Sequence, residues 1–428
     1  MLEKVLSNKI EVKTSKTTNW FALFKKVILA LQHLIAMFGA TVLVPVLTGL
    51  DTSVALVSAG LGTLIFHAVT KKKVPVFLGS SFAFIGGIIA VKEAHGGDLA
   101  YAQGGIVVAG LLYLLMSLII KKIGMDFIKK YLPSHVIGPM IIVIGLNLVP
   151  VAFDMASVNF LLAIITLGTA LSINLFAKGF IKQLSILIAV VVGYTAAHFQ
   201  GQVDPTAFVN APLLAIPAFT LPKFSIPAIA VLAPVVLAVF MEHVGDITTN
   251  GQVVGQDFIK DPGLNRTLLG DGLATLFAGL IGGPANTTYG ENTGVLAITK
   301  NYDPSILRLA AVFAIILGFV SKIGGFLGTI PTPVMGGISM MLFSMIALVG
   351  VQTIKNNKVQ FNAVNVIVMV VILVIGLWES YFQNITGINI GIKINETVSI
   401  TGLSLAAIVG VALNALLNIL RSEEHTSE

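Results

Sequence analysis

The sequence predicts an all-α polytopic membrane protein with 14 transmembrane segments arranged as a seven-plus-seven (7+7) inverted repeat. Three observations support this prediction: the chain is strongly apolar, its apolar runs recur at membrane-spanning length, and its cations follow the predicted topology. Of the 428 residues, 56% are hydrophobic and 11% are charged, and the mean hydropathy is +0.94. A water-facing surface needs far more charge than this, so a soluble globular protein is excluded.

Fourteen apolar runs approach the roughly 17–25 residues that cross a bilayer as a helix. The third and the tenth runs are short or interrupted by Gly, Ser and Thr. We expect discontinuous helices with short extended stretches at both. They are seven spans apart, as two repeats of seven require, although two closely packed Gly-rich helices would also explain them. The ranges are 27–48, 52–70, 76–91, 103–120, 135–152, 158–177, 180–199, 228–246, 267–283, 289–299, 306–325, 330–350, 362–378 and 401–420.

The Lys and Arg residues give an independent check on this layout. With a cytoplasmic amino terminus, 22 of the 26 fall in segments on the inside, and the exceptions are Lys92, Lys223, Lys322 and Lys393. The positive-inside rule therefore favours both termini in the cytoplasm, with residues 1–26 as a cytoplasmic tail that contains no cleavable signal peptide. The last residues, 421–428, resemble translated vector sequence, and we expect them to be a non-native tail.

Residue types argue against several kinds of chemistry. The chain has no cysteine, which excludes a disulfide scaffold, a thiol nucleophile and thiolate-bound metal. It also has no HExxH motif, so we expect no enzyme activity, no catalytic residues, no metal site and no cofactor apart from a coupling proton. On the first span, Gln32 and His33 are expected to hold that helix against the broken spans by hydrogen bonding.

Four acids lie in apolar spans or at the broken tenth span: Glu242, Asp246, Asp271 and Glu291. Each charge costs at least about 2.5–3.5 kcal/mol in mid-membrane. No Lys or Arg lies within the central part of a span except Lys322, near the outer end of the eleventh, so ion pairs cannot neutralise all four acids. Protonation, a bound ligand or a water-filled cavity is expected to compensate.

The eighth span indicates a proton-binding site. Glu242 and Asp246 are four residues apart, so both carboxyl groups lie on one helix face, and their mutual repulsion favours a proton on one of them. His243 lies about 100° away around the helix and is expected to make a structural hydrogen bond. Alternatively, Asp246 is a helix-end carboxylate wetted from the cytoplasm. Asp271 is a further candidate for proton coupling, or serves helix packing.

The two broken spans carry matching motifs, GGPANTTYGENTGV and VPVFLGSSFAFIGG. A short helix near Glu291 would leave the N–H groups of Gly290 and Glu291 free, and Phe82 marks the corresponding half-helix start. Backbone donors and carboxylate acceptors then fit a planar ligand with alternating C=O and N–H groups, with Phe82 or Tyr289 stacking on it. From the residues alone, the interpretation stops at a proton-coupled transporter of a small amide-bearing solute.

Five motifs add a resemblance: LQHLIAMFGATVLVPVL, LGSSFAFIGG, MEHVGD, DPGLNRTLLGDG and GGPANTTYGENTGV. Together they resemble the bacterial uracil permeases of the nucleobase–ascorbate transporter family (nucleobase:cation symporter-2), from about residue 20 to 420. The resemblance implies proton symport, a homodimer, the bacterial cytoplasmic membrane and two domains. The core domain would comprise residues 27–134 and 228–329, and the gate domain 135–227 and 330–420.

The resemblance also assigns roles to individual residues. The base would be hydrogen-bonded by Glu242 and Glu291, contacted by the backbone of Phe82 and Gly290, and lined by Tyr289 and Ala40. One departure concerns Asp246, which stands where such uracil permeases often carry a proton-relaying His. In that case we expect Asp246 to titrate through coupling to Glu242.

The same departure affects the substrate. Asp246 and Asp271 look like the purine-transporting branch, whereas Glu291 is of the pyrimidine type. We therefore expect a proton-coupled uracil importer that works by alternating access, with a xanthine-type, purine-type or broad-range permease as the alternative. A related anion exchanger would require a basic residue at the midplane and usually a soluble carboxyl-terminal domain, and the sequence indicates neither.

Overall fold

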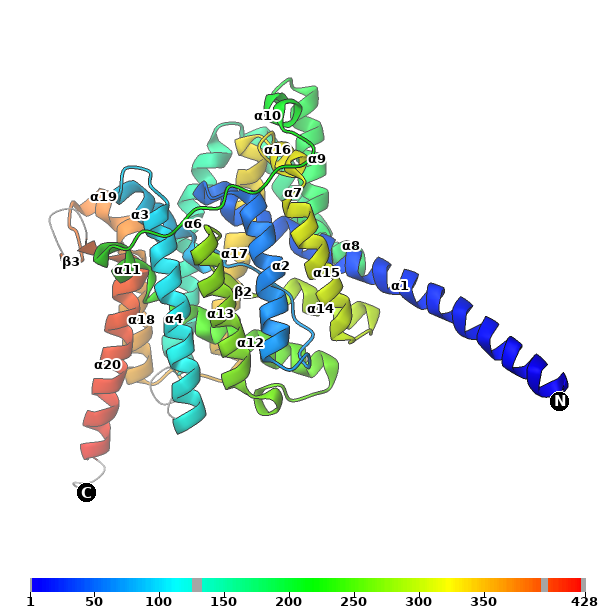
Figure 1. Cartoon of the computed structure of the whole chain (residues 1–428). Coiled ribbons are helices and arrows are strands. Elements are labelled where there is room, and N and C mark those ends of the chain that lie inside the picture. Colours follow the sequence, from blue (N-terminus) through cyan, green and yellow to red (C-terminus); the bar gives the residue numbers. More distant parts are fainter. Residues whose placement is uncertain (1, 125–132, 394–398, 425–428) are drawn as a thin grey trace.

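The computed structural model describes residues 2–124, 133–393 and 399–424, so the last four residues of the expected non-native tail lie outside it. Most of the described chain is helical (Figure 1). The α-helices are α1 (Leu2–Thr48), α2 (Thr52–Val69), α3 (Ile85–Ala94), α4 (Ala100–Ile123), α6 (Ser134–Ser157), α7 (Phe160–Phe176), α8 (Phe180–Gln183), α9 (Ser185–Phe199), α10 (Thr206–Asn210), α11 (Ile226–Leu232), α12 (Val235–Val254), α13 (Leu264–Ile281), α14 (Gly290–Thr299), α15 (Pro304–Gly318), α16 (Ser321–Leu327), α17 (Thr332–Asn356), α18 (Ala363–Leu377), α19 (Gln383–Thr386) and α20 (Gly402–Glu424).

Shorter elements interrupt these helices. They are the 3₁₀-helix η1 (Phe82–Phe84), the π-helical turns η2 (Ile259–Gly263) and η3 (Trp378–Phe382), and the strands β1 (Leu78–Ser80), β2 (Asn286–Thr288), β3 (Ile392–Lys393) and β4 (Ser399–Ile400). All fourteen predicted apolar ranges coincide with helical elements. The third range contains β1, η1 and α3, and β2 leads directly into the tenth, so strands and half-helices occur where we expected discontinuity.

Within the described residues, seven helices are individually long and apolar enough to cross a bilayer: the part of α1 from Ala22, α2, α4, α6, the α11–α12 pair, α17 and α18 with η3. Helices α15 and α16, bent by 80° at a short break, bring the number to at most eight. The remaining predicted ranges coincide with shorter or less apolar helices. The structure is thus a multi-helix membrane fold, and α1 continues the first span backwards through most of the expected tail.

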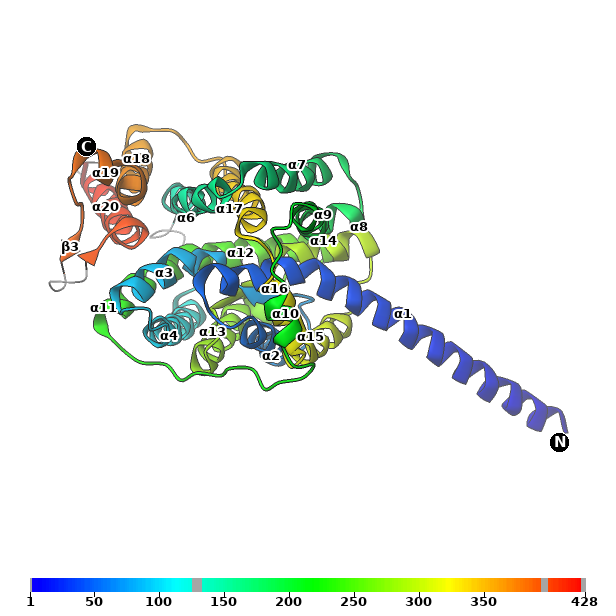
Figure 2. The same ribbon diagram turned by 90° about the horizontal axis from the view of Figure 1, so that it is seen from above.

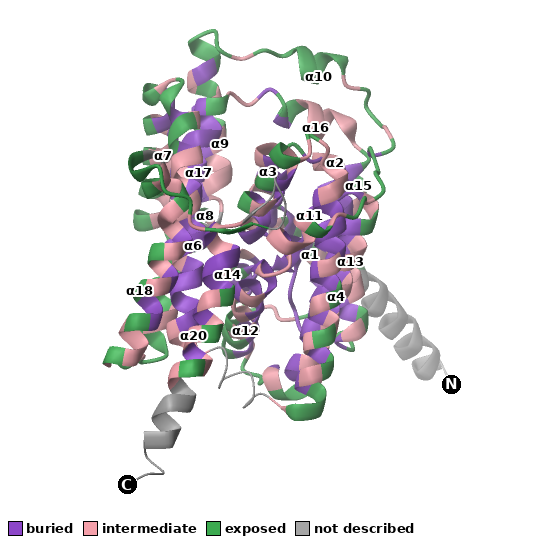
Figure 3. Cartoon of the chain, turned by 90° about the vertical axis from the view of Figure 1, so that its left-hand side faces the viewer, coloured by how far each residue is buried: buried purple, intermediate pink, exposed green. Residues whose placement is uncertain are grey.

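Two groups of helices lie side by side when the molecule is viewed from above (Figure 2). In one group α4 packs along α13, and α2 packs along α15 and α13. In the other α6 packs along α17 and α18, α7 along α17 and α9, and α18 along α20. Helices α3, α12 and α14 lie between the groups, and the buried residues concentrate inside the bundle (Figure 3).

The strands β1 and β2 join the two broken spans as an antiparallel pair, with Leu78 opposite Thr288 and Ser80 opposite Asn286. Side chains satisfy their outer backbone groups, because the Leu78 N–H donates to Thr63 Oγ1 (2.9 Å) and Thr275 Oγ1 donates to the Asn286 carbonyl (2.9 Å). Extended backbone inside a membrane protein requires such partners, since lipid offers none.

Glycine and proline bring the chain from α13 into β2. Gly282 ends α13 with φ +92°, and a Cβ on it would lie 2.3 Å from Thr220 Oγ1, so a side chain is excluded on both counts. Pro284 follows and cannot continue the helix. The strand therefore begins within a few residues of the helix end.

The connection from α9 to α11, residues 200–225, crosses the surface and is fixed to the α3–α4 turn near its end. Lys223 Nζ lies 2.7 Å from Asp98 Oδ2, and the Lys223 N–H donates to the Ala100 carbonyl (2.9 Å). The hydrogen bond from Lys223 lowers the pKa of Asp98 below its ordinary value, and the same bond raises the pKa of Lys223.

Candidate functional site

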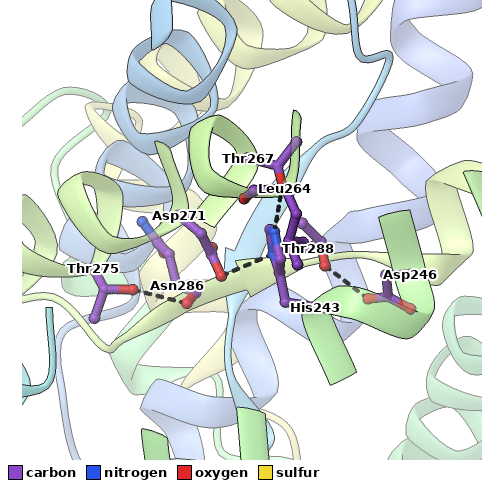
Figure 4. A network of polar contacts seen from close by, with 8 residues as sticks. All are labelled: His243, Asp246, Leu264, Thr267, Asp271, Thr275, Asn286 and Thr288. Atoms are coloured by element: carbon purple, nitrogen blue, oxygen red, sulfur yellow. Dashed lines mark hydrogen bonds and ion pairs between the residues drawn. The ribbon is translucent and has the colours of Figure 1, made fainter. Parts of the chain in front are cut away.

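The site is built around α12, which presents Glu242 and Asp246 one turn apart. Both residues keep part of their surface accessible although they lie inside the bundle, whereas Asp271 has none. Asp246 Oδ2 accepts a hydrogen bond from Thr288 Oγ1 at the end of β2 (2.8 Å, Figure 4). Asp246 Oδ1 lies 3.9 Å from the position that a Cβ on Gly290 would take. Asp246 therefore connects α12 with the start of α14.

Helix α14 begins at Gly290, directly after extended Tyr289, and Glu291 lies in its first turn. Gly290 is exposed, and its N–H has no helical carbonyl one turn earlier, as at every helix start. Glu242, Asp246 and Glu291 are close enough for their charges to interact. The structure thus brings three predicted acids to one helix start.

Phe82 occupies the equivalent place in the other broken span. It begins η1 directly after β1, and its half-buried ring packs against side chains of two hydrophobic clusters. Because β1 pairs with β2, the starts of both half-helices lie close to the same strand pair. This is the arrangement of backbone donors that the matching sequence motifs predict.

Two further predicted residues lie behind this surface. Ala40 is fully buried, and Tyr289 is 4% exposed. The Tyr289 hydroxyl donates to the Ser80 carbonyl (2.9 Å), and a Cβ on Gly79 would lie 2.4 Å from the Tyr289 ring. Tyr289 thus braces β1, and its role in lining a ligand stays a prediction.

His33 has the structural role predicted for it. Asn292 Nδ2 on α14 donates to the His33 carbonyl (3.0 Å) and lies 3.2 Å from His33 Nδ1, which ties the first helix to the broken span. Gln32 Oε1, by contrast, is buried without a hydrogen-bond partner in the described part of the chain.

Asp271 on α13 has a basic neighbour, His243, which the count of Lys and Arg in the spans did not include. His243 Nδ1 lies 3.2 Å from Asp271 Oδ2, and both side chains are completely buried (Figure 4). The structural hydrogen bond predicted for His243 is present, between Nε2 and Thr267 Oγ1 (3.1 Å). Sequence reasoning missed Thr267 and Thr288, although Thr267 and Asp271 are one turn apart and share a helix face.

A cavity of about 480 Å³ lies between the two helix groups, and none of the four membrane acids lines it. It is bounded by α3, by Asn147 and Leu148 of α6, and by η3 and the start of α20. Its lining includes Ala83, the residue after Phe82, and Val235, which lies two helical turns before Glu242. Among the described residues, no group of three or more His, Asp or Glu side chains forms a metal site.

Known proteins resemble this chain over nearly its whole length. Residues 24–385 match the model of the Permease family, Xan_ur_permease. The uracil permease of Bacillus caldolyticus is 44% identical over 405 residues, covering 91% of each chain. The uracil permeases of Bacillus subtilis (strain 168) and Escherichia coli (strain K12) are 42% and 38% identical and cover 95% and 94% of this chain, with the same shares of their own chains.

Solved structures show a similar fold at low sequence identity. SLC26A9 matches 93% of this chain and 66% of its own, with a TM-score of 0.68 and 12% identity. The transmembrane domain of the cyanobacterial bicarbonate transporter BicA matches 92% of this chain and 97% of its own, with a TM-score of 0.60 and 14% identity. The arrangement of helices is therefore that of membrane transporters.

Proposed function

Because the chain belongs to the Permease family, we propose that it is a proton-coupled symporter that imports uracil across the bacterial cytoplasmic membrane by alternating access. Family membership makes it a multi-pass membrane transporter and not an enzyme. The relatives named uracil permease support uracil as the substrate. The observation that carries the proposal is the convergence of Glu242, Asp246 and Glu291 on the start of α14.

These groups match the hydrogen-bonding edge of uracil. An ionised carboxylate only accepts hydrogen bonds, so Glu242 and Glu291 would read the N–H groups of the base. The backbone N–H groups at Phe82 and Gly290 would donate to its carbonyls. We further propose that Tyr289 and Ala40 complete the pocket from behind, where small changes in helix position would expose them.

The proton site in this proposal is the pair of Glu242 and Asp246. Both are partly accessible, and their repulsion favours one shared proton. When Glu242 accepts from uracil as a carboxylate, the shared proton resides on Asp246, so uracil binding is linked to protonation of the pair. Thr288, which donates to ionised Asp246, favours release of that proton once uracil has left. The sequence also makes Asp271 a candidate for proton coupling, but we argue below that it positions α12 instead.

The packing supports the finer architecture of 14 spans in a seven-plus-seven repeat. If α2 corresponds to α13 and α4 to α15, the contact of α4 with α13 becomes that of α15 with α2, and both occur. Likewise the contact of α7 with α17 corresponds to that of α18 with α6. The same relation pairs β1 with β2. Core (27–134, 228–329) and gate (135–227, 330–420) domains would then be the two groups in Figure 2.

Two parts of the proposal rest on sequence reasoning alone: cytoplasmic termini with residues 1–26 on that side, and a homodimer. A purine-type or broad-range permease is the second candidate, because Asp246 is a residue of the purine-transporting branch.

Uptake of radiolabelled uracil into proteoliposomes with an inward-acid gradient tests the function. We expect accumulation that unlabelled uracil competes more strongly than xanthine, hypoxanthine or thymine. Glu291→Gln removes an acceptor at the site and is expected to abolish uptake, whereas Asp154→Asn, an exposed carboxylate at the end of α6, is the matched control. Unchanged uptake in Glu291→Gln would remove this residue from the site, and stronger competition by xanthine would favour the second candidate.

A further inference from the structure

His243 and Asp271 form the only contact between a base and one of the four membrane acids in the described chain. They come from neighbouring helices, α12 and α13, and neither has solvent-exposed surface. Neither oxygen of Asp271 makes a hydrogen bond within the described residues, and neither does His243 Nδ1, which lies 3.2 Å from Asp271 Oδ2. The imidazole is therefore the one group that can neutralise this carboxyl.

The position of the protons follows from Thr267, on the other side of the imidazole. Thr267 Oγ1 lies 3.0 Å from the Leu264 carbonyl, which has no proton, so the Thr267 hydroxyl donates there. With that hydrogen bond in place, the Thr267 oxygen is the acceptor toward His243, and we assign a hydrogen to Nε2 accordingly. Two protonation states then give the pair no net charge. In one, Nδ1 also carries a hydrogen, so that an imidazolium faces an ionised Asp271. In the other, Nδ1 carries a lone pair and Asp271 is a neutral carboxylic acid.

The surroundings of the pair favour this neutral state. Glu242 and Asp246 lie on the same helix as His243, and Asp271 interacts electrostatically with both. Tyr113 of α4 is fully buried and interacts electrostatically with Asp271, and Phe66 of α2 places its ring 6.5 Å from the imidazole, nearly edge-on. Loss of the proton would add a buried, uncompensated negative charge to this cluster. Glu242 and Asp246, unlike Asp271, are partly accessible and can exchange protons with solvent.

The pair also fixes the rotation of α12. Three side chains on this helix bind other elements: His243 contacts α13, Asp246 accepts from Thr288 of β2, and Asn250 donates to the Pro75 carbonyl (3.0 Å) and to Thr293 of α14 (3.0 Å). With 100° between successive residues, anchoring His243 directs the face with Glu242 and Asp246 toward α14.

We infer that His243 and Asp271 are positioning residues that retain one proton throughout transport, and that the transported proton resides on Glu242 and Asp246. This inference rests on the proposed symport of uracil and protons. In this inference Glu242 and Asp246, which are partly accessible, titrate during transport. Asp271, which is fully buried, holds α12 in place.

A double-mutant cycle in the full-length protein tests the contact. His243→Gln leaves Asp271 buried without its base, and we expect a KM for uracil about tenfold higher and a lower melting temperature. Adding Asp271→Asn replaces the charged pair by two amides that can hydrogen-bond without a trapped proton. The double variant is therefore expected to recover most of the loss, and effects that simply add would overturn the pairing.

The number of protons moved per uracil tests the proton assignment. In Asp271→Asn we expect the wild-type ratio and the wild-type pH midpoint of uptake, although at a lower rate. Asp246→Asn is the comparison variant, in which we expect both the proton-to-uracil ratio and the pH midpoint of uptake to change. A reduced proton ratio in Asp271→Asn with uracil binding retained would overturn the inference and make Asp271 a coupling site.

Melting temperatures in detergent keep this test separate from the proposed function. They require no transport, so the cycle between His243 and Asp271 can be completed even with a protein that carries no uracil. Absent uracil uptake by the wild type with a non-additive cycle would reject the function and retain the pair. Normal uracil uptake with an additive cycle would retain the proposed function and reject the pairing of His243 with Asp271.

Discussion

Gly290→Ala separates binding from folding at the start of α14. The backbone there is helical, and Gly290 is not among the glycines with positive φ. A Cβ at this position meets only Asp246 Oδ1, at 3.9 Å. The protein therefore has room for the methyl group, and alanine is expected to stabilise it by about 0.4–1 kcal/mol through the unfolded state.

The same methyl group occupies space that the proposed substrate needs. It would stand beside the backbone N–H that we assign to a uracil carbonyl, on the side facing Asp246. Overpacking a well-filled site costs about 1–3 kcal/mol, which corresponds to a KM about 5- to 140-fold higher. The variant is thus expected to gain or keep stability while it loses affinity, a combination that general damage to the fold does not produce.

The assay measures the KM for labelled uracil in proteoliposomes and the melting temperature in detergent. Gly168→Ala is the matched control, because Gly168 on α7 also has open space around a built Cβ and lies away from the acids. We expect the control to keep the wild-type KM. A wild-type KM in Gly290→Ala would refute the placement of the substrate at this N–H.

Three other variants test separate parts of the structure. Asp246→Asn is expected to remove the pH dependence of uracil accumulation, measured across a pH series; full pH-dependent accumulation would exclude it from the proton path. Asn286→Ala deletes buried hydrogen bonds to the Ser58 and Ala274 carbonyls, so we expect about 1–3 kcal/mol of lost stability in thermal unfolding, and an unchanged melting temperature would contradict this. Lys223→Met frees the connection of residues 200–225. The low pKa of Asp98 means that the ion pair stabilises above the ordinary Asp pKa and is lost as the pH falls through the lowered value. Proteolysis of that connection is thus expected to be faster than in wild type at neutral pH and equal in acid.

The helices could be predicted from the sequence because the length of an apolar run is a local property. Ranges such as 135–152 and 330–350 are found again as α6 and α17, longer by several residues at their ends. The expected tail of residues 1–26 instead continues into α1, and the sequence offers no Gly or Pro before residue 39 to end a helix there.

Contacts between segments that are distant in the sequence were harder to predict. The motifs at Phe82 and Gly290 predicted two half-helix starts, but pairing of Leu78 with Thr288 depends on where whole helices pack. The partnership of His243 and Asp271 was missed for the same reason, since each belongs to a different helix and a single sequence does not state which faces meet. The spacing of Thr267 and Asp271 was the available signal, because a polar stripe on an apolar helix needs a polar counterpart.

The pairing of β1 with β2 has a consequence for biosynthesis. Ribosomes deliver β2 about 200 residues after β1, so the first broken span enters the bilayer before its hydrogen-bonding partner exists. Until residues 285–289 emerge, the Phe77 carbonyl and the Ser81 N–H, which bond to Tyr289 and Ala285 across the strand pair, must find water, lipid headgroups or an insertase, and the amino-terminal half waits in an unfinished form. Nascent chains arrested ahead of β2 are thus the ones that membrane quality control would recognise as incomplete.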